Sequence, residues 1–222
     1  MLFDEEELKR RADYMAENGG IQPMHGVFYN YSIRYTAECA LNAFLLYEEL
    51  LECDSEAWEL VSSVQEAIGH AGALSRYFWP PVKPKDNSPF ARHKTARGAS
   101  LRKHYGLTED SPLCMEGLRK ARNAWEHFDE RLDVYLLKHL AGEFIPEPLV
   151  ASHALADSPV KKVFKLIDPE AQCLVLLGEK FFFGPIRDEV IRILSHFSEY
   201  KNLSDRLIGH REVVGKGGLE PG

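Results

Sequence analysis

The chain has 222 residues, of which 45% are hydrophobic and 27% are charged, and it carries a formal net charge of -7. This composition is typical of one globular domain, and the length leaves little room for two full domains. No apolar run approaches the roughly 20 residues of a membrane span, and the acidic N-terminus lacks a signal-peptide core, so we expect a cytoplasmic protein with no membrane partner.

Two helices are expected in the first quarter of the chain. Residues 1–30 form an N-terminal segment with a short charged helix over 4–18, which Asn18 and the glycines after it would end. From about Tyr31 to Leu51 the apolar residues recur at spacings near 3.6. This period predicts an amphipathic helix and the start of a helical bundle.

A second amphipathic helix is expected to follow directly. Asp54 and Ser55 are candidate N-caps for it. The consecutive prolines at 80 and 81 would end it, because proline lacks the backbone N–H and clashes with the preceding turn. The predicted bundle spans residues 31–142.

The segment from Pro80 to Tyr105 concentrates positive charge. It has a local charge of about +6 and leaves about -13 for the rest of the chain. Its composition predicts an exposed connection with a short helical piece over 99–105. Because cations can follow a nucleic-acid backbone, the candidate RNA-binding residues here are Arg92, Lys94, Arg97, Arg102 and Lys103. The alternative is a merely solvated connection.

A long helix is expected between Ser111 and Gly142. Serine followed by proline is a typical helix start, and the glycine is a reasonable stop, so this helix would be about 45 Å long. Its apolar residues step by three and four and form one stripe that should face the bundle core. The stripe consists of Leu118, Ala121, Trp125, Phe128, Leu132 and Tyr135.

After residue 142 the hydrophobic period changes. The runs "VFKLI", "QCLVLL" and "FFFG" predict two or three short strands in a hairpin or small meander. A final helix is expected from about Pro185 to Leu203, and residues 206–222 read as a disordered tail. The predicted fold is therefore mainly α: a helical bundle with a small β appendage and a final helix over 143–205.

A polar cluster on the long helix carries groups that fit RNA cleavage. At about 100° per residue, Arg122, Asn123 and His127 fall roughly opposite the apolar stripe. An imidazole can accept and return a proton near neutral pH, and a guanidinium matches phosphate oxygens. If two such faces meet in a two-fold homodimer, they supply a base for the 2′-hydroxyl, an acid for the leaving oxygen and a cation for the phosphate, with no metal or cofactor.

These residues resemble a known signature. Arg122, the polar Asn123 after it and His127, on the last long helix of an all-α bundle, look like the R-x4-6-H motif of HEPN (higher eukaryotes and prokaryotes nucleotide-binding) domains. The resemblance covers about residues 31–140. It implies a metal-independent endoribonuclease in which Arg122 and His127 of two protomers form one composite catalytic site. It also implies a toxin or phage-defence effector, with an antitoxin or defence-complex partner.

Other interpretations of the cluster remain open. The motif is weak by itself, since Arg97 and His104 also stand at a permitted spacing. Arg122 paired with Glu126 at i,i+4 would make the cluster an ordinary solvated helix face. A metal site is disfavoured because no Glu-x-x-His pair repeats on another helix.

Acidic neighbours complicate the ribonuclease hypothesis. Glu126, Asp129 and Glu130 would repel a phosphate unless Arg119 or another nearby arginine neutralises them. The rival hypothesis is a non-catalytic helical module that binds a protein partner or a nucleotide. Four scattered cysteines without CxxC spacing indicate neither a zinc ribbon nor a dithiol centre.

Overall fold

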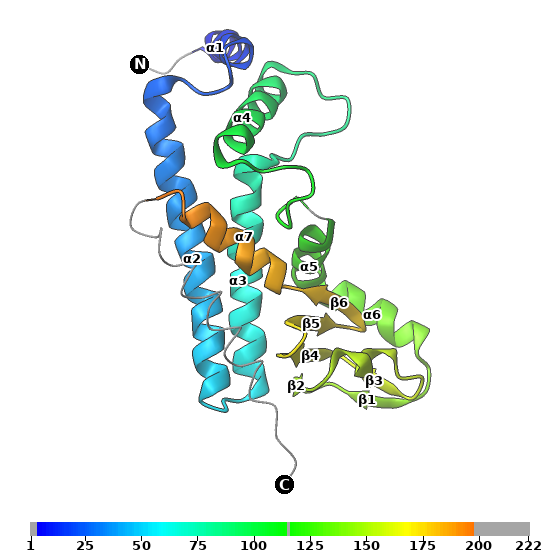
Figure 1. The fold of residues 1–222 in the computed structure, drawn as a ribbon. Coiled ribbons are helices and arrows are strands. Elements are labelled where there is room, and N and C mark those ends of the chain that lie inside the picture. The colour runs from blue at the N-terminus through cyan, green and yellow to red at the C-terminus, as the bar shows by residue number, and fades with distance from the viewer. Residues whose placement is uncertain (1–3, 115, 198–222) are drawn as a thin grey trace.

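The computed structural model describes residues 4–114 and 116–197 (Figure 1). Its helices are α1 (Glu5–Glu17), the 3-10 turn η1 (Pro23–His25), α2 (Gly26–Glu52), α3 (Ala57–Phe78), α4 (Pro89–Tyr105), α5 (Glu116–Glu126), α6 (Phe128–Lys138), the 3-10 turn η2 (His153–Asp157) and α7 (Gly184–Leu194). Its strands are β1 (Glu143–Ile145), β2 (Leu149–Val150), β3 (Lys161–Val163), β4 (Lys165–Asp168), β5 (Cys173–Leu176) and β6 (Glu179–Phe182). The prediction of a mainly helical chain with a small sheet region near its C-terminal end is confirmed. Across the described ranges, no helix is both long and apolar enough to cross a membrane.

The centre of the fold is the hairpin of α2 and α3. Both helices turn small side chains toward each other, with Ala37 and Ala40 on α2 and Ala67 and Ala71 on α3 all fully buried. Small residues let the two helices approach closely, and the larger buried Phe44 of α2 packs against Phe183, which follows β6. The N-cap of α3 was predicted at Asp54 or Ser55, but it is Glu56, one or two residues later, because Glu56 and Glu59 form a capping box there.

Helix α7 crosses the hairpin (Figure 1). Its apolar face, which includes Ile186, Val190 and Leu194, is buried in the same core cluster as the α2 and α3 residues. The final helix was expected to run from Pro185 to Leu203, whereas α7 ends at Leu194. The remainder of that prediction, and the predicted tail over 206–222, lie outside the described residues.

The sheet region consists of a four-stranded sheet and a separate strand pair. The order in the larger sheet is β2-β4-β5-β6, with β4, β5 and β6 antiparallel and β2 parallel to β4, while β1 pairs with β3 in parallel. The predicted meander corresponds to β4, β5 and β6. The other three strands were missed because segments of two or three residues are too short to show an alternating pattern.

Both faces of the sheet are buried. Ile167, Leu174 and Leu176 point into the main core with the helices, while Leu166, Cys173 and Val175 form a smaller cluster on the other face. Alternate residues of β4 and β5 thus serve two cores, as the two-residue period of a strand requires. The predicted bundle and the predicted appendage therefore share one hydrophobic core.

The basic segment differs from its prediction. It was expected to be a loop with a short helix over 99–105, but α4 covers 17 residues. Ser88 caps this helix by accepting a hydrogen bond from the Ala91 N–H, Pro89 occupies its first turn, and Gly106 ends it in the left-handed conformation. Its buried face includes Ala91 and Gly98, which are too small to create a clear apolar period.

The long helix predicted from Ser111 to Gly142 is two helices. They meet at His127, whose φ of -120° and ψ of 39° are not helical. No proline or glycine occurs at this junction, so the break comes from a change of packing partner. Helix α5 lies against α3, whereas α6 follows the sheet region, where the Tyr135 hydroxyl donates to the Val163 carbonyl at 3.3 Å. One straight helix could not follow both surfaces.

Gly98 marks a close approach between α4 and the end of α3. A Cβ at this position would lie 2.6 Å from the Phe78 carbonyl oxygen and 2.7 Å from Pro80 Cδ. We expect Gly98→Ala to lower the free energy of unfolding by about 1–3 kcal/mol, because the backbone must shift. Gly117→Ala is the control, since a Cβ there meets nothing within 4 Å, and it should be neutral or stabilising by up to about 1 kcal/mol. Urea unfolding measures both, and equal effects would contradict the close approach.

Candidate active site

Arg122 lies in the groove between α5 and α3. The arginine stem lies against α3 at Gly72, where a Cβ would be 3.4 Å from Arg122 Cδ. The Arg122 side chain is 25% exposed. It therefore does not point straight away from the core, as the helical-wheel argument predicted, but runs along the edge of α3.

The guanidinium of Arg122 is held by its own helix. Its Nε lies 3.3 Å from Glu126 Oε1, and its terminal nitrogen donates to Asn123 Oδ1 at 3.3 Å. The i,i+4 pair with Glu126 is thus present. Nε is also buried without a hydrogen-bond partner, because its approach to Glu126 is an ion pair of poor hydrogen-bond geometry. The pair leaves a buried donor that a better-placed acceptor can satisfy.

His127 occupies the junction of α5 and α6. Its side chain is 58% exposed, and its Nδ1 lies 3.8 Å from Glu130 Oε2. Among the described residues, no hydrogen bond or ion pair joins His127 to Arg122. Each motif residue instead has a glutamate of its own as neighbour, and the supporting Arg119 is paired with Glu116 at 3.6 Å.

A small cavity adjoins Arg122. Its volume is about 160 Å³, and its lining is formed by Gln65, Ile68, Gly69, Ala121, Arg122, Trp125, Glu126 and Leu174. Lys165 of β4 adds a cation nearby, with Nζ 5.7 Å from the centroid of the Trp125 ring and 4.8 Å from that of Phe128. The groove beside the motif arginine thus offers an aromatic wall, an amide and a second positive charge.

Two of the candidate RNA-binding residues fasten α4 to the fold. Arg92 pairs with Asp13 of α1 at 2.5 Å. Arg102 donates to the Phe78 carbonyl at 2.5 Å and stacks over Trp79, with its guanidinium carbon 5.6 Å from the ring centroid. These contacts join the N-terminal helix and the end of α3 to α4, so both arginines stabilise the packing of α4.

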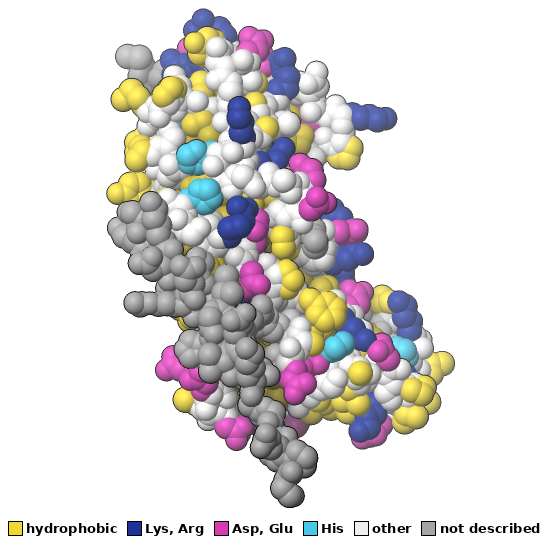
Figure 2. Space-filling view, in the orientation of Figure 1, with side chains coloured by type: hydrophobic (Ala, Val, Ile, Leu, Met, Phe, Trp, Pro, Cys, Tyr) yellow, Lys and Arg dark blue, Asp and Glu magenta, His cyan; other side chains and the backbone are white. Residues whose placement is uncertain are grey.

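The other three basic candidates differ in exposure. Arg97 donates to the Arg76 carbonyl at 3.2 Å, whereas Lys94 and Lys103 are exposed. Helix α4 lies at the opposite end of the bundle from α6 (Figure 1), so within one chain the basic helix and the α5–α6 junction are separate. On the face in Figure 2, basic side chains alternate with acidic ones and do not merge into one patch.

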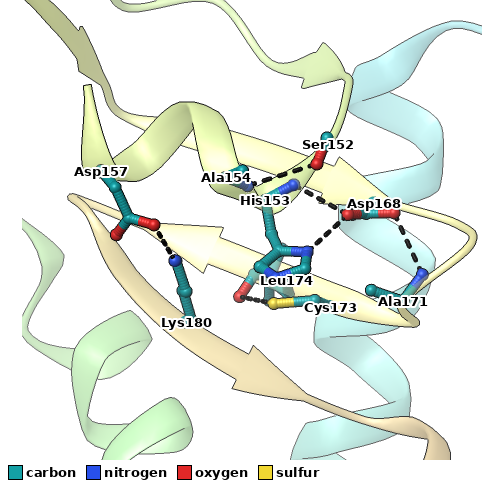
Figure 3. A network of polar contacts seen from close by, with 9 residues as sticks. All are labelled: Ser152, His153, Ala154, Asp157, Asp168, Ala171, Cys173, Leu174 and Lys180. Atoms are coloured by element: carbon teal, nitrogen blue, oxygen red, sulfur yellow. Dashed lines mark hydrogen bonds and ion pairs between the residues drawn. The ribbon is translucent and has the colours of Figure 1, made fainter.

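A second polar cluster was not foreseen from the sequence (Figure 3). Asp168, at the end of β4, is 5% exposed. It accepts hydrogen bonds from the His153 backbone N–H at 2.7 Å, from His153 Nδ1 at 2.6 Å and from the Ala171 N–H at 3.1 Å. Burial alone would raise the pKa of Asp168, but these hydrogen bonds outweigh it and lower the pKa below its ordinary value.

The geometry of this cluster fixes a tautomer without making a catalytic site. An ionised Asp168 can only accept, so His153 Nδ1 carries the proton. Cys173 lies opposite Asp168 in the strand ladder, yet burial raises the pKa of its thiol to about 11. A buried, protonated thiol is a poor nucleophile. The cluster therefore anchors η2 to the sheet. The sequence did not indicate it, because His153 and Asp168 are 15 residues apart and match no motif.

Comparison with known proteins gives no relative: no family model, no curated protein and no solved structure matches the chain. The class that the described residues define is a helical bundle with a small sheet region packed into the same core. Of the sites described above, the α5–α6 junction combines an exposed imidazole with a partly buried guanidinium, and it therefore offers the most chemistry.

The Asp168 cluster predicts a pH-dependent stability. Asp168→Asn should lower the free energy of unfolding by about 2 kcal/mol near neutral pH, because the amide carries no charge and turns an NH2 group toward a position where Asp168 accepts an N–H bond. Since folding lowers the pKa of Asp168 below 3.8, the contribution is complete above that pH and is lost as the pH falls through the lower, folded value. The variant should lack this acid-side loss.

Asp157 provides the matched control. It is the last residue of η2, the segment that Asp168 holds, and it is 70% exposed and pairs with Lys180 at 2.6 Å, so Asp157→Asn should cost less than about 1 kcal/mol. Urea unfolding of the three proteins at several acidic and neutral pH values makes the comparison. If both variants shift equally, the buried network is not what stabilises this part of the fold.

Proposed function

We propose that the chain is a metal-independent endoribonuclease of HEPN type, in which Arg122 and His127 act on the RNA phosphodiester. The observation that carries the proposal is the α5–α6 junction, where the break exposes His127 one turn beyond a partly buried Arg122 with an unsatisfied Nε. An accessible imidazole and a held guanidinium five residues apart supply the base and the phosphate-binding cation that 2′-hydroxyl attack requires.

The proposed reaction uses two copies of the chain. His127 removes the proton of the 2′-hydroxyl, and the freed oxygen attacks the adjacent phosphorus. The bond from phosphorus to the 5′-oxygen breaks, and His127 of the partner subunit returns a proton to that oxygen. The products are a 2′,3′-cyclic phosphate and a 5′-hydroxyl, and Arg122 stabilises the charge that develops on the phosphoryl oxygens. DNA lacks the attacking hydroxyl and would not react.

The surroundings of Arg122 support a nucleic-acid substrate. Trp125 forms one wall of the adjoining cavity, and an aromatic ring can stack a base next to the scissile phosphate. The volume of about 160 Å³ is well below the roughly 300 Å³ of drug-sized sites, so it fits one small planar group. Lys165 nearby, and Lys94 and Lys103 on α4, would attract the RNA backbone.

A second candidate is a non-catalytic module that binds a protein partner or a nucleotide. The observation in its favour is the ion pair of Arg122 with Glu126, which neutralises the motif cation within its own chain. In the ribonuclease, a substrate phosphate must displace Glu126.

In a cellular setting the proposed ribonuclease would act as a toxin or phage-defence effector under the control of an antitoxin or complex partner. Expression of the chain would then be toxic unless His127 is replaced.

Cleavage of total cellular RNA in EDTA tests the enzyme directly. We expect the wild type to give cyclic phosphate ends, and His127→Ala and Arg122→Ala to reduce the rate by about 10²–10⁴-fold. Arg97 and His104 repeat the motif spacing on α4, so His104→Ala is the matched control and should cleave normally. If no protein cleaves, or if the His127 variant matches the wild type, the ribonuclease proposal is wrong.

The ion pair predicts a gain of function. Glu126→Gln removes the competing carboxylate from Arg122, so RNA should bind about two- to fivefold more tightly, as expected for a partly exposed pair. The control is Asp133→Asn, an exposed acid on α6. Fluorescence anisotropy with a 2′-deoxy, uncleavable oligonucleotide measures affinity apart from chemistry. Weaker binding by Glu126→Gln would show that Glu126 assists the site and does not compete in it.

A further inference from the structure

One face of the first half of α2 and the turn before it is apolar and exposed. The exposed fractions are 82% for Met24, 50% for Val27, 66% for Phe28, 70% for Tyr31 and 69% for Tyr35. These residues recur at intervals of three and four, so they form one stripe along the helix. Hydrophobic side chains project along the upper left edge of the molecule in Figure 2, over this end of α2. We call this set the α2 stripe.

The composition of the α2 stripe is that of an interface core. Methionine and aromatic residues are enriched at the centres of protein interfaces, and charged residues are depleted there. From Met24 to Asn42 the only lysine, arginine, aspartate or glutamate residues are Arg34 and Glu38, which pair with each other at 2.8 Å. The stripe thus has no net charge, although the chain carries -7.

The size of the stripe suits a second copy of the chain. Its exposed side chains offer on the order of 700 Å² of surface, close to the roughly 800 Å² that each partner buries in a standard stable interface. A nucleic acid would need free cations here, and a charged peptide would need an opposite charge. A straight, neutral stripe on a helix matches the same stripe running antiparallel across a two-fold axis, where like meets like without charge repulsion.

We propose that two copies of this chain pair through the α2 stripe. With the axis midway along the stripe, Phe28 packs against Tyr31 of the partner subunit, and Met24 packs against Tyr35 of the partner subunit. The second contact places a thioether beside an aromatic ring, which is favourable. The phenol hydroxyls remain at the rim, where water can reach them.

This pairing does not depend on the proposed ribonuclease. The stripe is on α2 and the motif is on α5, and in Figure 1 these helices lie on either side of α3. The α2 pair therefore leaves the two motif faces apart. A chain that also meets a copy through its motif face has two different two-fold contacts, which close into a tetramer when their axes cross at right angles. In either case, loss of the α2 contact halves the mass.

Sedimentation of the full chain at micromolar concentration tests the proposal. Phe28→Glu and Tyr31→Lys should each give half the wild-type mass, with association weakened at least about 100-fold, as for an interface hot spot. Both residues are mostly exposed, so circular dichroism should show unchanged folding. Trp58→Lys is the control: Trp58 on α3 is 61% exposed and lies outside the stripe, and its replacement should leave the mass unchanged.

Mixing the two stripe variants tests the antiparallel arrangement. Because positions 28 and 31 face each other across the axis, Phe28→Glu and Tyr31→Lys chains should associate together although each alone does not. A monomeric wild type, or stripe variants of wild-type mass, would overturn the proposal, and failure of the mixture would overturn the register. Stripe variants of wild-type mass that still cleave RNA would sink this inference alone, and a stripe dimer without cleavage would sink the ribonuclease alone. Cleavage by a wild-type monomer would sink both this inference and the two-copy reaction.

Discussion

The close contact between α2 and α3 is the constraint on which the rest of the fold depends. Small side chains such as Ala40 and Ala71 bring the two helices together, and helices α4, α5 and α7 and strands β2 and β4 then pack on α3. Helix α4 meets its C-terminal end, α5 lies along its side, and β2 and β4 contact it further along. Helix α7 closes the hairpin over both helices. A bulky residue at the alanine positions would separate the helices and displace all of these partners.

The sequence predicted the helices whose packing is one-sided. Periodic apolar residues located α2, α3 and most of α7, and short apolar runs bounded by turn residues located β4, β5 and β6. Prediction failed where one element serves two surroundings or packs with very small residues. Helix α4 buries Ala91 and Gly98, which carry little hydrophobic signal, and the break at His127 arises because α5 and α6 follow different surfaces. The extent of α4 and the break at His127 depend on the elements that these helices pack against, and the hydrophobic period of the segment itself does not reveal them.

The candidate site, like the fold, could be predicted from the sequence only in part. The spacing of Arg122 and His127 could be recognised from the sequence, and the pair between Arg122 and Glu126 could be foreseen as an alternative. The position of Arg122 along α3 could not be foreseen, because it arises from the packing of α5 on α3 beside Gly72. Asp168 and His153 also escaped notice, since a carboxylate in a strand and a histidine in a turn have no fixed separation. Arg102 was assigned to RNA by its charge alone, yet it bonds to the end of α3.

The shared core has a consequence for how the chain can be divided. Phe183 follows β6 directly and packs against Phe44 of α2 with ring centroids 6.1 Å apart, just where α7 begins. The meander and the crossing helix are thus continuous with each other and both complete the hairpin. A fragment that stopped after α6 would leave the surface of Phe44 in water. The strands therefore complete the core of the helices, and a part of the chain transplanted without them would carry an exposed apolar surface.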